Sequence, residues 1–83
     1  MEMTLEQIDA ELTKTLEILL ETKINPGDDI KIGNPISWDS IKHIEIIMTV
    51  EQQFNISFQT EDIPLLTSKK ALLDKINILK NHA

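Results

Sequence analysis

The sequence contains no cysteine among its 83 residues, which excludes disulfide bonds and thiolate metal ligands. Aromatic residues are also scarce, because only Trp38, Phe54 and Phe58 stand against fourteen isoleucines. We therefore expect one domain, residues 1–83, with a small aliphatic core and modest stability, since small domains bury a lower fraction of their surface. If the protein works with a thiol, that thiol has to come from outside the chain.

Basic residues and long apolar runs are few as well. The chain has eight basic and fourteen acidic residues. The resulting net charge of -6 argues against nucleic-acid binding, which needs a basic surface. This balance is typical of an ordinary solvated surface, and it also favours partners with basic docking surfaces. The longest apolar runs are three residues, as at Ile18–Leu20, and the N-terminus lacks a signal-peptide pattern. We expect a cytoplasmic protein with no membrane span.

Apolar periodicity predicts a first helix over about Leu5 to Thr22, introduced by a Thr4–Gln7 capping box. Asn25-Pro26-Gly27 then stops any continuation. The connection from residue 23 to residue 38 is long for a compact domain, but it is too apolar for a disordered linker. Its segment 30–32 alternates like a strand, yet nothing nearby offers a partner strand. We expect an ordered loop packed across the end of a helical bundle.

A second helix is predicted over Ser40 to Phe54, and two shorter segments follow it. Thr60 is the expected cap of a short acidic helix, which Pro64 keeps brief. Thr67 or Ser68 caps a last helix. The apolar residues of that last helix are spaced to pack inward: Ala71, Leu72, Leu73, Ile76 and Leu79.

The second helix carries more apolar residues than one face can hold. Four of them share one broad side: Ile46, Ile47, Val50 and Phe54. Ile41 and Met48 lie on nearly the opposite side, with Glu45 and Gln52 beside them. Since only one side can be buried, we expect an exposed apolar pair and interpret it as a partner-docking face.

Asp39-Ser40 places a hydroxyl at the start of the second helix, among unpaired backbone N–H groups and at the positive end of the helix dipole. Such a position suits a covalently attached phosphate. Asp and Ser are also ordinary helix caps, so the two residues alone leave both interpretations open.

The chain resembles the acyl carrier protein family, which includes peptidyl and D-alanyl carriers. The resemblance covers essentially the whole chain and is most specific from Asp39 to Ile76. Asp39-Ser40-Ile41 is similar to the family's Asp-Ser-Leu motif, whose serine accepts 4′-phosphopantetheine. The following segments match in register: Ile44-Glu45-Ile46-Ile47-Met48, Glu51, Phe54-Asn55-Ile56, Phe58, the short acidic helix and Leu66-Thr67-Ser68. Departures from the typical fatty-acid carrier are Trp38 before the motif, Ile41 for leucine, and the less acidic Lys42 and His43.

The resemblance implies an all-α, acyl-carrier-protein-like bundle of three main helices and one short helix, with a long ordered loop between helices 1 and 2. It implies a monomeric carrier, not an enzyme, with 4′-phosphopantetheine donated by coenzyme A to Ser40. Asp39 would cap the helix and help a phosphopantetheinyl transferase hold magnesium. The other expected partners are acyl-activating and acyl-transferring enzymes. The expected partner surface consists of Ile41, Glu45, Met48 and Ile63.

The resemblance leaves the cargo open, because an acyl and an aminoacyl carrier share the same attachment site. In the family, the core parts to admit an acyl chain. The runner-up function is a helical protein-interaction module that has the carrier fold but is not modified.

Two other kinds of site are disfavoured by the sequence. Ser40 and His43 could touch on one helix, but a hydrolase also needs an acid that orients the histidine and an oxyanion site. Asp39 is better placed as a cap, and we expect His43 to pack against the preceding loop, at Trp38. His43 and His82 have no second ligand at metal-binding spacing, and Asp28-Asp29 lacks the other ligands of a calcium loop. No metal site is predicted.

Overall fold

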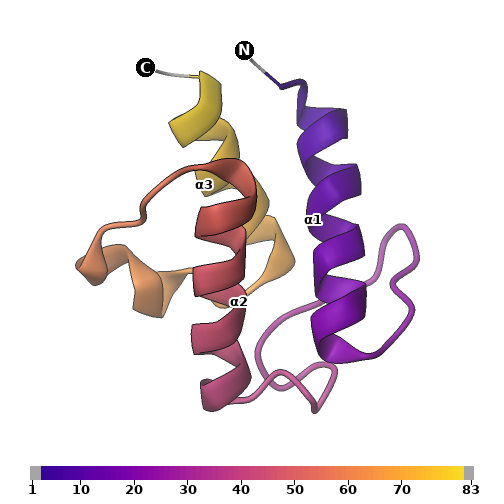
Figure 1. The fold of residues 1–83 in the computed structure, drawn as a ribbon. Coiled ribbons are helices and arrows are strands. Elements are labelled where there is room, and N and C mark those ends of the chain that lie inside the picture. Colours follow the sequence, from indigo (N-terminus) through magenta and orange to yellow (C-terminus); the bar gives the residue numbers. More distant parts are fainter. Residues whose placement is uncertain (1–2, 82–83) are drawn as a thin grey trace.

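The computed structural model describes residues 3–81, which form three α-helices and one 3-10 helix. The elements are α1 (Leu5–Leu20), α2 (Ser40–Phe54), η1 (Thr60–Leu65) and α3 (Lys69–Asn81). Figure 1 shows α1 and α2 side by side with α3 behind them, while η1 projects on the far side of α2 from α1. The start of α1 and the end of α3 lie together, because Asn81 Nδ2 donates to the carbonyl of Met3 at 2.9 Å. The predicted all-α class is confirmed.

Helix α1 begins as predicted and ends two residues early. The Gln7 N–H donates to Thr4 Oγ1 at 3.1 Å and the Thr4 N–H donates to Gln7 Oε1 at 2.9 Å, which completes the capping box. The helix ends at Leu20 because Glu21 adopts a left-handed conformation, with φ 53° and ψ 45°. The Glu17 carboxylate then accepts the Ile24 N–H at 2.8 Å and fixes the turn. The predicted end at Thr22 is therefore wrong.

The core is aliphatic and lies between the three α-helices. Its fully or nearly fully buried residues include Ile8, Leu12, Leu16 and Leu20 of α1, Ile46, Ile47, Val50 and Phe54 of α2, and Leu72 and Ile76 of α3. The residues of α2 and α3 are among those that the periodicity placed on the buried side, whereas Leu5 at the start of α1 is 50% exposed. Each such side chain contributes about 1.5–3 kcal/mol by its removal from water. Ala71, Leu73 and Leu79 pack against this core while partly exposed.

The loop between α1 and α2 is ordered, as predicted, but it does find a backbone partner. Its Ile32 N–H donates to the carbonyl of Thr67 at 2.8 Å, and the Lys69 N–H donates to the carbonyl of Ile30 at 2.8 Å. Lys31 also forms isolated bridges with Asn34 and with the segment before α3. Within residues 3–81 no strand forms, so segment 30–32 is a loop as predicted, and its bridge partner before α3 lies more than thirty residues further along the chain.

The last two helices, α3 and η1, differ in how their first turns are capped. Ser68 caps α3, since its Oγ accepts the Ala71 N–H at 3.0 Å. The predicted cap of the short helix is wrong: η1 begins at Thr60 and is preceded by Gln59, which makes no side-chain capping bond. An ion pair of 3.0 Å between Lys75 and Asp62 joins η1 to α3 instead. Within residues 3–81, no helix combines the length and apolar character needed to cross a bilayer.

Candidate functional site

The site begins at Asp39 and Ser40, where the long loop enters α2. Asp39 has extended backbone angles and caps the helix, because its Oδ1 accepts the Lys42 N–H at 2.8 Å. Its carbonyl accepts the His43 N–H at 2.9 Å. Ser40 follows as the first helical residue and is exposed. The predicted capping role of Asp39 is confirmed.

The start of α2 suits a covalently attached phosphate. By helix geometry, the N–H groups of Ser40 and Ile41 have no acceptor within α2, and the helix dipole places partial positive charge at the same end. A phosphodiester on the exposed Ser40 hydroxyl would lie against these donors. Ser40 and its surroundings therefore fit 4′-phosphopantetheine, the group that the resemblance implies.

Hydrogen bonds hold the loop just before Ser40. The Ser37 hydroxyl donates to the carbonyl of Leu20 at 2.9 Å, which ties the loop to the end of α1. The Trp38 carbonyl accepts the Gly33 N–H at 2.8 Å, and the Trp38 N–H donates to the carbonyl of Pro35 at 3.0 Å. Gly33 has φ +87°, a conformation that other residues rarely adopt. The loop therefore holds Ser40 at a defined position.

Trp38 and His43, which stand on either side of Ser40 in the chain, form a buried polar pair. Trp38 is 0% exposed and His43 is 8% exposed. The indole N–H donates to His43 Nδ1 at 3.2 Å, and the ring planes are inclined by only 26°. Because Nδ1 accepts, the imidazole proton is on Nε2, which donates to the carbonyl of Ile63 at 3.2 Å. The predicted packing of His43 on Trp38 is confirmed.

This arrangement removes the rival hydrolase interpretation. Both His43 nitrogens are engaged, one by Trp38 and one by the Ile63 carbonyl. The carboxylate of Asp39 is engaged by the backbone of Lys42. No nitrogen is left to take a proton from Ser40, which a nucleophilic serine requires.

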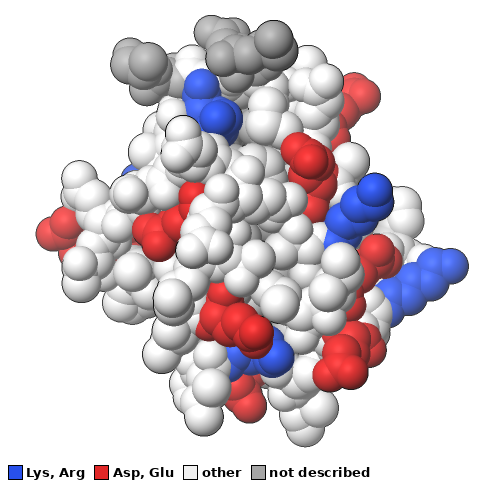
Figure 2. Space-filling view, viewed as in Figure 1, with Lys and Arg blue, Asp and Glu red and all other residues white. Residues whose placement is uncertain are grey.

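A largely apolar face lies on the opposite side of α2 from the core. Ile41, Ile44 and Met48 are 79%, 60% and 58% exposed and follow one another at helical spacing. With Glu45 and two neighbouring polar residues they line a shallow surface hollow of about 370 Å³. Figure 2 shows that this face carries few charges, whereas acidic and basic side chains gather along the α1 edge.

One ion pair lies on this face. Lys42 Nζ is 2.7 Å from Glu45 Oε1. The hydrogen bond to Glu45 raises the pKa of Lys42 above its usual value, and the nearby carboxylates of Glu45, Glu21 and Asp39 act in the same direction. Lys42 is therefore charged at neutral pH, with its ammonium group against the Glu45 carboxylate.

The structure brings together three of the four predicted partner-surface residues. Ile41, Glu45 and Met48 line the same hollow. Ile63 does not line this hollow; it is half-buried on η1 against the core, and its carbonyl accepts from His43. Ile44 was missed as a member of the exposed face, although its position three residues after Ile41 was a signal for it.

The acidic loop residues take part in local contacts. The Asp28 carboxylate accepts the Asn25 N–H at 2.8 Å, and Asp29 pairs with Lys31 at 3.0 Å. Across residues 3–81, no group of three or more acidic or histidine side chains is placed to hold a metal ion. His82 lies outside the described residues.

Comparison with models of known protein families gives no match to this chain, and comparison with curated proteins gives none either.

Proposed function

We propose that the protein is an acyl carrier protein that bears 4′-phosphopantetheine on Ser40. The observation that carries the proposal is an exposed serine as the first residue of a helix, capped by Asp39 and held by an ordered loop. The motif Asp39-Ser40-Ile41, with its resemblance to the carrier family, supports the same proposal. The absence of cysteine is consistent with a thiol supplied by the attached arm.

The loading reaction requires little of the chain itself. The Ser40 oxygen forms a new bond to phosphorus as the pyrophosphate bond of coenzyme A breaks. Adenosine 3′,5′-bisphosphate leaves, and the hydroxyl proton passes to the transferase. Asp39 holds the start of α2 in place, and, by resemblance to the family, contributes to magnesium binding in the transferase. The thiol of the arm then carries acyl or aminoacyl groups as thioesters.

The carrier would present its cargo and leave the bond-making chemistry to partner enzymes. A flexible arm raises the effective concentration of its cargo at the active site of a docked enzyme. The exposed face of Ile41, Glu45 and Met48 begins beside Ser40, so an enzyme that acts on the arm can contact this face. The net charge of -6 favours partners whose approach is steered by basic surfaces.

The test is the intact mass of the chain after incubation with coenzyme A, magnesium and a broad-specificity phosphopantetheinyl transferase. We expect the wild type to gain one phosphopantetheine and Ser40→Ala to gain none. Ser57→Ala is the matched control, because Ser57 is an exposed serine outside a helix start. Loading of Ser40→Ala, or no loading of a folded wild type by several transferases, would contradict the proposal.

The second candidate is an unmodified interaction module. The exposed apolar residues Ile41, Ile44 and Met48 favour it, because a helix with apolar side chains at this spacing can bind in a partner's groove. The loading experiment separates the two functions, since only the carrier uses the Ser40 hydroxyl.

A further inference from the structure

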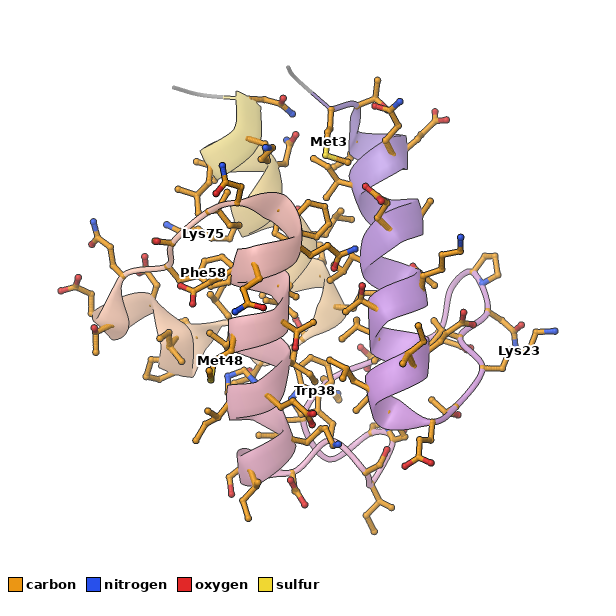
Figure 3. All side chains as sticks on the ribbon, viewed as in Figure 1. Met3, Lys23, Trp38, Met48, Phe58 and Lys75 are labelled. Atoms are coloured by element: carbon orange, nitrogen blue, oxygen red, sulfur yellow. The ribbon has the colours of Figure 1, made fainter. Side chains whose placement is uncertain are left out.

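Two buried rings stand on either side of Ser40 in the chain. Trp38 precedes Ser40 by two residues and His43 follows it by three, which places His43 on the neighbouring turn of α2. Figure 3 shows Trp38 between α2 and α1, near the end of the bundle where the loop enters α2. A group attached to Ser40 that turned inward would therefore meet these rings first.

Hydrogen bonds close the space between the loop, α2 and η1. The Trp38 indole N–H and the Ile63 carbonyl are joined through the two nitrogens of His43, at 3.2 Å each. Parting these elements would leave a buried indole N–H without an acceptor and the imidazole without its partners. Such unpaired buried groups are costly, so the contact resists opening.

Four surface hollows are described for residues 3–81, all of them open to solvent, and Trp38 lines none of the four. The hollow nearest Ser40 in sequence is formed by the outward face of α2, on the other side of the helix from the core. The core behind it is densely packed, with Ile8, Ile46 and Ile76 fully buried.

We propose that Trp38 and His43 seal the core at the Ser40 end, so that cargo on the arm stays outside the helical bundle. This inference rests on the proposed carrier function. It assigns the cargo to short or polar acyl groups, aminoacyl groups included. A long fatty chain would gain no burial in the core, because the sealed bundle does not admit its methylene groups.

The experiment compares carriers loaded with cargo of increasing length. A broad-specificity transferase attaches the acyl-phosphopantetheine of acetyl-, butyryl- or octanoyl-coenzyme A to Ser40. Methyl-labelled isoleucine then reports on the core by NMR, since Ile8, Ile46 and Ile76 are buried, and exposed Ile18 and Ile36 serve as surface controls. Thermal unfolding of the same samples gives a second reading.

We expect the methyl signals of Ile8, Ile46 and Ile76 to be the same with acetyl and octanoyl cargo, and the Tm to be the same too. Movement of the core signals with octanoyl alone, or a rise in Tm of about 5 °C or more, would show that the chain enters the core. That result would overturn the seal and leave the carrier function standing. If the wild type takes no phosphopantetheine, the carrier function fails and the proposed seal fails with it.

A pair of variants tests whether Trp38 is the residue that seals the core. Trp38→Ala opens a cavity at the Ser40 end, so octanoyl cargo should now move the core methyl signals and raise the Tm above that of the acetyl form. Phe54→Ala is the matched control, because Phe54 is buried at the other end of α2, about 20 Å away along the helix. If Trp38→Ala folds and octanoyl still leaves the core signals unchanged, Trp38 is not the seal. If it does not fold, the wild-type comparison decides the proposal.

Discussion

Replacing His43 with leucine tests its polar contact with Trp38. His43→Leu keeps a side chain of similar size and removes both hydrogen bonds, one from Trp38 and one to the Ile63 carbonyl. The indole N–H of the fully buried Trp38 is then left without an acceptor. An unsatisfied buried donor costs about 1–3 kcal/mol, and we expect a loss of about 2 kcal/mol in the free energy of unfolding.

A loss of that size is large for this chain. For a domain of 60–100 residues, about 2 kcal/mol lowers the Tm by roughly 8–16 °C. The measurement is urea unfolding followed by far-UV circular dichroism, with the free energy obtained by linear extrapolation. Circular dichroism is preferred to fluorescence because the control variant, Trp38→Phe/His43→Leu, removes the only tryptophan.

The double variant Trp38→Phe/His43→Leu supplies the control. It removes both the indole N–H and its acceptor, so no indole N–H is left unpaired. We expect its loss in free energy of unfolding to be about 1–2 kcal/mol smaller than the summed losses of Trp38→Phe and His43→Leu. Wild-type stability in His43→Leu, or strict additivity of the two changes, would refute the argument that this hydrogen bond closes the contact.

Further predictions concern the start and end of α2. Ser40→Ala should unfold within about 0.5 kcal/mol of the wild type, because Ser40 is exposed, and a loss of folding would show that the serine is structural. Asp39→Ala should lose about 1 kcal/mol in urea unfolding and Asp39→Asn much less; equal losses would argue against the cap. Phe54→Ala should lose about 3–5 kcal/mol, and a smaller loss would mean that the site collapses. Since Glu45 raises the pKa of Lys42, the stability contributed by their pair should persist at neutral pH and disappear only as the pH rises through that pKa; an NMR titration of Lys42 that matches an unpaired lysine would contradict this.

The parts of the fold that local chemistry determines could be predicted from the sequence. Both ends of α2 were predicted correctly, because the Asp39 cap and the apolar period that ends at Phe54 are local signals. The capping box at Thr4 is local in the same way. The end of α1 was not predicted, since it depends on Glu17 reaching across the turn to the Ile24 backbone.

Contacts between distant segments account for the remaining differences. The partner of Ile32 is Thr67, and no pattern within the loop identifies it. The same limit applies at the site. The packing of His43 on Trp38 was expected from their proximity in the chain, whereas the bond that joins His43 to Ile63, twenty residues away, was not. The assignment of Ile63 to the partner surface stays a prediction, since its carbonyl accepts this bond while its side chain is half-buried.

The central claim is that the chain carries a thiol that its own sequence lacks, and thiol titration tests it most directly. Because the sequence has no cysteine, the unmodified chain should give no reaction with a thiol-specific reagent. After incubation with coenzyme A and a phosphopantetheinyl transferase, and removal of free coenzyme A, we predict one reactive thiol per chain, and none in Ser40→Ala. No thiol on a folded wild type, or an equal amount on Ser40→Ala, would contradict the account.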